Sequence, residues 1–116
     1  MSQHATLALV GAVGGAGTTR TAVESGALLA RAGYDVTILD AAVGTQGLAA
    51  YVEGRIEADL TAVLTEEATL EAATYPIIGD RPGRLRAVPV HAPFQRLARA
   101  MTAGAAERFE RQLAAA

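Results

Sequence analysis

Short apolar runs alternate with a longer segment of helical spacing in the first third of the chain. The apolar run over 6–10 stops at a glycine, which is typical of a strand buried on both faces. Residues 19–32 carry small apolar side chains on one face, which predicts a helix with Gly33 at its C′ position. Residues 35–39 predict a second strand with Asp40 at its carboxyl end. Together these segments predict a βαβ unit.

The middle of the chain carries weaker signals. A short helix is expected over 45–52, closed by Gly54. Asp59 is placed to cap a helix with apolar residues at 60, 63 and 64. Thr69 similarly precedes a helical turn that Pro76 ends.

The last third predicts a turn over 81–83, a strand over 85–90 and helices over 93–101 and 105–113. Pro89 places the strand at the edge of a sheet or marks its end, and Gly104 separates the two helices. Neither a repeat nor a linker marks a domain boundary. The pattern therefore predicts one α/β domain built on a parallel sheet with flanking helices.

Composition narrows the functional classes. The chain has 116 residues, 51% of them hydrophobic and 19% charged, with a formal net charge of −2. This is a globular composition without the basic field that attracts nucleic acid. Cysteine is absent, which excludes disulfides and thiolate metal sites. The apolar stretches are too short for a membrane-spanning helix, and we expect a cytoplasmic location. All ten basic residues are arginine, so a mechanism that needs a lysine is excluded.

The glycine-rich run Gly11-Ala-Val-Gly-Gly-Ala-Gly-Thr-Thr19 joins the first predicted strand to the first predicted helix. Such a turn gathers backbone N–H groups and the positive end of a helix around one small volume. It is therefore suited to binding phosphate.

Two kinds of nucleotide site use this device. Gly11, Gly15 and Gly17 have the G-x-x-x-G-x-G spacing of short-chain dehydrogenases, and Asp40 lies where an acid would bind an adenosine ribose. The short chain and the lack of lysine argue against a dehydrogenase. A small NAD(P)-binding domain remains an alternative.

The second kind is a P-loop. The run Gly14-Gly-Ala-Gly-Thr-Thr19 matches G-G-x-G-K-[ST] except at Thr18, which replaces the lysine. Here the sequence resembles the MinD/ParA family of deviant P-loop ATPases. Val36-Thr-Ile-Leu-Asp-Ala-Ala-Val-Gly44 is similar to the family's D-x-D-x-G motif, and 59–64, 68–73 and 85–89 resemble the stretches that follow.

This resemblance implies a P-loop NTPase-like three-layer sheet, of which residues 1–116 are the N-terminal part. It also implies binding of ATP and Mg²⁺, and a role in positioning or partitioning cargo through a homodimer. The implied nucleotide-binding residues are Gly14, Gly15, Ala16, Gly17, Thr18, Thr19 and Asp40, with Thr19 and Asp40 at the metal.

Several departures bear on catalysis. The family's signature lysine falls at Val13, its loop lysine at Thr18 and the second aspartate of its D-x-D motif at Ala42. Phosphoryl transfer depends on positioning and charge stabilisation, so this ATPase-derived chain is not expected to hydrolyse ATP alone. Arg20 is a replacement cation only if it points back into the loop, and its position on the helix disfavours that.

Residues 107–116 resemble the helix that leads into a further strand of the family, which lies between the first two strands. Either the chain is a fragment whose complement is elsewhere, as in a truncated reading frame or a half-domain, or the strands over 6–10 and 35–39 pair directly. An alternative function on the same fold is a non-catalytic interaction module that binds a partner at an exposed sheet edge.

Other polar residues have simpler interpretations. Gln46 and Gly47 lie where the family has a nucleotide-sensing loop, but a plain turn also explains them. His4 and His91 show no metal-ligand spacing. A cluster of arginines is interpreted as a solvated face rather than a surface for DNA or lipid: Arg81, Arg84, Arg86, Arg96 and Arg99.

Overall fold

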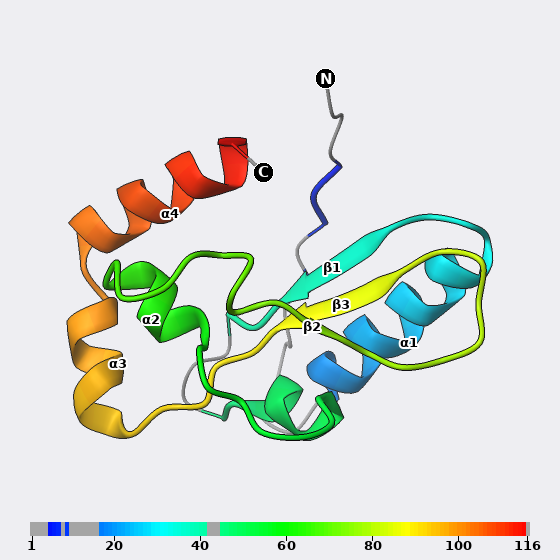
Figure 1. Cartoon of the computed structure of the whole chain (residues 1–116), viewed down its shortest axis with the longest axis horizontal. Coiled ribbons are helices and arrows are strands. Elements are labelled where there is room, and N and C mark those ends of the chain that lie inside the picture. The colour runs from blue at the N-terminus through cyan, green and yellow to red at the C-terminus, as the bar shows by residue number, and fades with distance from the viewer. Residues whose placement is uncertain (1–4, 8, 10–16, 42–44, 116) are drawn as a thin grey trace.

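The computed structural model describes residues 5–7, 9, 17–41 and 45–115. Within them the chain forms a three-stranded mixed sheet, four α helices and one 3₁₀ helix, so the α/β class is confirmed. Figure 1 shows the order, which is α1 (Thr18–Arg31), β1 (Val36–Leu39), η1 (Gly47–Tyr51), α2 (Leu60–Leu64), β2 (Tyr75–Pro76), β3 (Leu85–Val88), α3 (Phe94–Ala100) and α4 (Ala103–Ala115).

Helix α1 ends as its sequence predicts. Gly33 adopts a φ of 102°, the left-handed conformation that glycine adopts without a steric penalty. Its N–H donates to the carbonyl of Ala30, and the N–H of Tyr34 donates to that of Leu29. This pair of bonds is the Schellman arrangement. It turns the chain sharply from α1 into β1.

The sheet has the order β1-β3-β2. Strands β1 and β3 are parallel, with Val36 opposite Leu85 and Leu39 opposite Val88. The prediction of a purely parallel sheet is wrong for β2, which pairs antiparallel to β3. The connection over 77–84 is too short for a crossover and permits only a hairpin-like return. Pro89 follows the last residue of β3, the central strand, so it marks an end and not an edge.

The predicted buried strand over 6–10 is not found among its described residues. Leu7 and Leu9 are 78% and 40% exposed and belong to no strand. Strand β1 pairs with β3 alone among the described strands. The second edge of β1 therefore has no neighbouring strand in the described part of the chain.

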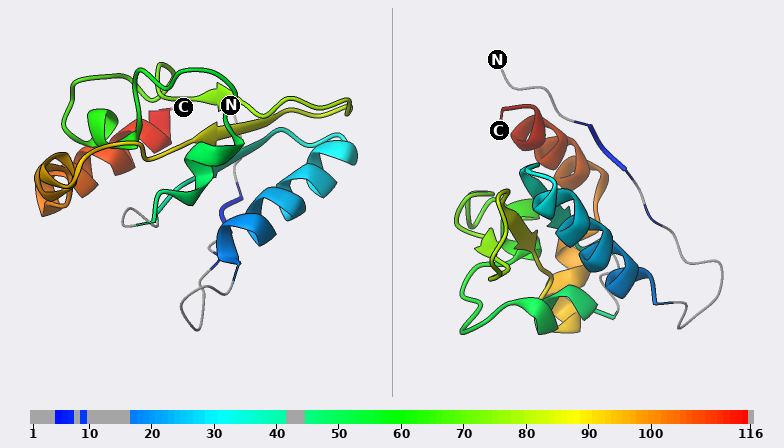
Figure 2. Two further views of the ribbon diagram at one scale, coloured as in Figure 1. Left: turned by 90° about the horizontal axis from the view of Figure 1, so that it is seen from below. Right: turned by 90° about the vertical axis from the view of Figure 1, so that its right-hand side faces the viewer.

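The two faces of the sheet contact different helices. Ile38 and Ala87 pack with residues of α1 and η1, including Val23 and Leu48. Leu39 and Val88 point to the opposite face and pack with α2 and α3. Figures 1 and 2 show α1 and η1 on one side of the sheet, and α2, α3 and α4 gathered beyond the carboxyl end of β3.

The predicted helical turn after Thr69 is confirmed over 70–73. The N–H of Ala73 donates to the carbonyl of Thr69, and the Thr69 hydroxyl accepts a hydrogen bond from the N–H of Ala72 as a cap would. Tyr75 and Pro76 then form the two-residue strand β2. The prediction that Gly104 separates the last two helices is wrong, because Gly104 lies inside the first turn of α4. The hydroxyl of Thr102 caps this turn by accepting a bond from the N–H of Ala105.

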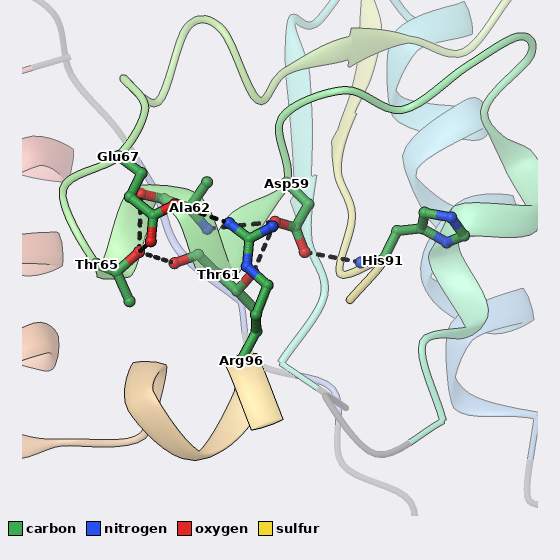
Figure 3. A network of polar contacts seen from close by, with 7 residues as sticks. All are labelled: Asp59, Thr61, Ala62, Thr65, Glu67, His91 and Arg96. Carbon is green, nitrogen blue, oxygen red and sulfur yellow. Dashed lines mark hydrogen bonds and ion pairs between the residues drawn. The ribbon is translucent and has the colours of Figure 1, made fainter. Parts of the chain in front are cut away.

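Asp59 joins the start of α2 to the chain that leaves β3. Its buried carboxylate, 3% exposed as a residue, accepts bonds at Oδ1 from the N–H of Ala62 (3.2 Å) and the hydroxyl of Thr61 (2.7 Å). Oδ2 accepts a bond from the N–H of His91 at 2.9 Å. Figure 3 shows these bonds converging on one carboxylate. The predicted cap is confirmed, and its second oxygen fixes the position of His91.

Replacing Asp59 with alanine tests this junction. The variant Asp59→Ala removes a helix cap and leaves the N–H of His91 without its carboxylate partner, so we expect a loss of about 2–4 kcal/mol in the free energy of unfolding. Urea titration followed by circular dichroism measures the loss. The control Glu71→Ala removes an exposed acid and should change stability by less than about 0.5 kcal/mol. Equal effects of the two substitutions would contradict the assignment.

Candidate functional site

The predicted phosphate-binding loop is described only at its last residues. Gly14, Gly15 and Ala16 lie outside the described residues, as do Val13 and Ala42. Gly17 precedes α1 with φ 77° and ψ 28°, a left-handed conformation that favours glycine. Thr18 and Thr19 are the first two residues of α1. The glycine of the motif thus sits where the backbone has to turn into the helix.

The beginning of α1 suits a negatively charged ligand. The first N–H groups of an α helix have no partner within the helix. The cap residue, Gly17, has no side chain that could accept hydrogen bonds from them. The first turn also contains no acidic side chain that would repel an anion. These features are compatible with phosphate oxygens as the groups that bind the helix end.

Thr19 contacts the segment that follows β1. A Cβ atom built on Gly47 would lie 3.0 Å from the Thr19 hydroxyl oxygen, so only glycine permits this approach without displacement. Gly47 begins η1. The structure therefore places the predicted metal-binding hydroxyl beside the first residue of the 3₁₀ helix.

Asp40 approaches the same segment from the end of β1. Its side chain is buried, with the residue 5% exposed, and its Oδ2 accepts a bond from the N–H of Leu48 at 3.3 Å. The N–H of Asp40 donates to the carbonyl of Val88, which extends the parallel pairing beyond β1. Thr19 and Asp40 thus contact the consecutive residues Gly47 and Leu48. The sequence places them 21 positions apart, and the fold brings both to the start of η1.

Gln46 serves a structural role in this conformation. Its backbone is left-handed, with φ 53°, and its side-chain amide pairs with the backbone of Ala92. Nε2 donates to the carbonyl of Ala92 at 2.8 Å, and Oε1 accepts from the N–H of Ala92 at 3.1 Å. The amide that would sense a nucleotide is therefore bonded to the chain that follows β3.

Arg20 points along α1 instead of back toward the loop. Its Nε donates to Glu24 Oε1 at 3.0 Å, one helical turn further on, and both side chains are largely exposed. The hydrogen bond and the charge of Glu24 raise the pKa of the Arg20 guanidinium above its usual value. This geometry agrees with the expectation that Arg20 does not replace a loop lysine.

An open hollow of about 580 Å³ adjoins η1 and is lined in part by Ala49, Ala50, Arg55 and His91. The imidazole of His91 turns away from Asp59, as Figure 3 shows. Arg55 and His91 come from separate loops, so no sequence motif predicted that they would line a hollow together. His4 lies outside the described residues.

Among the described residues, no three acidic, histidine or cysteine side chains cluster as a metal site would require. Thr19 and Asp40 are only two ligand residues, and a Mg²⁺ site can be as small as this because that ion keeps several of its waters. No helix in the described part of the chain is both long and apolar enough to cross a lipid bilayer.

Comparisons with known proteins found no match: no protein-family model, no curated protein and no solved structure resembles the chain at a significant level. The case for a function therefore depends on the residues and their geometry.

Substitution tests the pair of hydrogen bonds between the Gln46 side chain and the Ala92 backbone, which we call the Gln46 clamp. Gln46→Ala removes both bonds to Ala92 and places alanine in a left-handed conformation, so we expect a loss of about 2–3 kcal/mol in the free energy of unfolding. Gln46→Gly should cost less, because it relieves the backbone strain. Urea unfolding measures both, and Gln95→Ala, at an exposed glutamine of α3, is the matched control. A loss no larger than that of the control would contradict the clamp.

Proposed function

We propose that this chain binds a nucleotide, with ATP the leading candidate, at the beginning of α1. The observation that carries the proposal is the left-handed Gly17 at an α-helix end without a side-chain cap, followed by Thr18 and Thr19. Backbone N–H groups at such a helix end bind phosphate oxygens. This proposal also takes the preceding glycine-rich residues as the rest of the cradle, and assigns the chain to a MinD/ParA-like P-loop fold.

Asp40 and Thr19 support a site for Mg²⁺ next to these phosphates. Both contact the start of η1, and a hydroxyl with a carboxylate is a donor set that Mg²⁺ accepts. When bound, the ion would neutralise phosphate charge. In this proposal Thr19 holds it through the hydroxyl, and the buried Asp40 acts on it directly or through a water.

The proposed activity is binding without hydrolysis by this chain alone. The sequence contains no lysine, and Arg20 is bonded to Glu24. The charges that stabilise phosphoryl transfer would have to come from elsewhere, such as a second copy or a complementary chain. Positioning or partitioning of cargo is the family role that this proposal carries with it.

A second candidate function is a non-catalytic interaction module. It is favoured by the second edge of β1, which has no neighbouring strand among the described residues, and by the exposed side chains of Leu7 and Leu9. An open strand edge accepts a strand from a partner protein.

Calorimetric titration with ATP, ADP and NAD, each with and without Mg²⁺, tests these candidates. We expect Mg²⁺-dependent ATP binding and no release of phosphate over time. Thr19→Ala should weaken binding about tenfold or more, because it removes a metal ligand. Asp40→Asn should weaken it while keeping an acceptor for the N–H of Leu48. The control Thr21→Ala removes an exposed hydroxyl of α1 and should leave binding unchanged.

Two outcomes would contradict the leading proposal. Metal-independent binding of NAD would favour the small dinucleotide-binding domain. Absence of binding to every nucleotide, by a chain that gives a folded spectrum, would favour the interaction module.

A further inference from the structure

The arginines that cluster in the sequence occupy two different places in the fold. Arg96 and Arg99 belong to α3, and Arg96 pairs with Glu67 at 3.1 Å. Arg81, Arg84 and Arg86 instead line one hollow of about 440 Å³. We call it the arginine hollow, and its apolar lining includes Ile77 and Ile78.

The arginine hollow lies at the opposite end of the sheet from Asp40. Asp40 follows the carboxyl end of β1, whereas the hollow is formed by the chain from 76 to 86 at the amino end of the parallel strand β3. The N–H of Gly83 donates to the carbonyl of Ala30, which anchors this chain beside the end of α1. Figure 1 shows the β2–β3 connection next to that helix end. The hollow is therefore separate from the site proposed above.

Arg86 carries an unexplained buried group. Leu85 points toward α1, because its Cδ1 would lie 2.9 Å from a Cβ atom built on Gly26. The alternation of the strand therefore directs Arg86 to the opposite face. Its Nε atom is buried and has no hydrogen-bond partner among the described residues. Buried donors of this kind are almost always satisfied in folded proteins, so an unsatisfied one indicates that a ligand or water completes the site.

Arg81 is held in place over the backbone of the hollow. Its Nη1 donates to the carbonyl of Ile77 at 3.2 Å, and a side chain at Gly79 would collide with its guanidinium. A guanidinium has five N–H donors, so this single bond leaves others for a ligand. The side chain of Arg84 is exposed at the same hollow.

The charge balance of the hollow is positive. None of its three arginines forms an ion pair with a carboxylate in the described part of the chain, whereas Arg20, Arg96 and Arg108 each do. Two acids lie close by: Asp35 accepts a bond from the backbone N–H of Arg84, and Asp80 precedes Arg81 in the chain. Three guanidinium groups against two carboxylates leave an excess of one positive charge.

We propose that the arginine hollow binds an oxyanion, phosphoryl or carboxylate, carried on a molecule with an apolar portion. Guanidinium groups bind both oxyanions through paired hydrogen bonds. Ile78, whose side chain is largely exposed, supplies an apolar wall in the lining of the hollow. The inference does not depend on nucleotide binding at α1, because no described residue belongs to both sites.

Amide chemical shifts of the folded chain, recorded during titration, test the proposal. The probes are phenyl phosphate, inorganic phosphate and benzoate. We expect phenyl phosphate to shift amides over 77–86 and to bind several-fold more tightly than inorganic phosphate, because its ring covers the apolar wall. Binding of phenyl phosphate alone identifies phosphoryl ligands, binding of benzoate alone identifies carboxylates, and binding of both supports the shared chemistry.

Substitutions then connect binding to the arginines. Arg84→Gln changes an exposed side chain and should weaken phenyl phosphate binding about tenfold, because a charge-assisted hydrogen bond is lost. Arg86→Gln should weaken it at least as much. Arg99→Gln is the matched control on α3 and should change affinity less than about twofold. Because Arg84 is exposed, its variant stays informative even if Arg86→Gln fails to fold.

Three results would overturn the proposal. The amides over 77–86 could stay unmoved at about 20 mM of each probe, which corresponds to no useful affinity. The shifts could appear only at 17–20, which would assign all oxyanion binding to the beginning of α1. Arg84→Gln and Arg99→Gln could weaken binding equally, which would indicate a general charge effect.

Discussion

The buried carboxylate of Asp59 connects the start of α2 to the chain that follows β3. One oxygen caps α2 and the other holds the backbone of His91, just after β3. The N–H of Leu60 adds a bond to the carbonyl of Pro89. The apolar residues of α2 are thereby set against Val88 and Val90. If this junction opened, the cluster beyond β3 would keep only its apolar contacts with Leu39 and Val88 and the bond at Pro89.

The same junction positions the candidate site indirectly. His91 and Ala92 are consecutive, so the bond to Asp59 also places the backbone group that Gln46 clamps. Gln46 in turn precedes Gly47 and Leu48, which contact Thr19 and Asp40. Hydrogen bonds therefore connect the start of α2 to Gln46, and the close approach of Gly47 to Thr19 continues this path to the start of α1.

Local signals in the sequence were sufficient for part of this arrangement. Asp59 and Gly33 could be predicted because a helix cap and a left-handed turn each depend on neighbouring residues alone. The strands β1 and β3 were predicted from apolar runs, although the structure ends β3 at Val88. The apolar run over 6–10 shows the limit of that signal, because a strand also needs a partner edge that its own residues do not specify.

Contacts between distant positions could not be predicted in the same way. Gln46 and Ala92 are 46 positions apart, and only the folded chain brings an amide to that backbone. The five arginines looked like one group because they are close in sequence. The structure divides them, since α3 and the β2–β3 connection lie at opposite ends of β3. Most of the predicted phosphate-binding loop lies outside the described residues.

The exclusive use of arginine gives the hollow between β2 and β3 a permanent charge. A guanidinium stays protonated in proteins, so the site would not lose its charge as the surrounding acidity changes. It also has no side-chain amine, which removes acetylation as a way to switch it off. Release of a bound oxyanion would therefore depend on competing ions, on protonation of the ligand, or on movement of the short connection that carries Arg81 and Arg84 relative to Arg86 in β3.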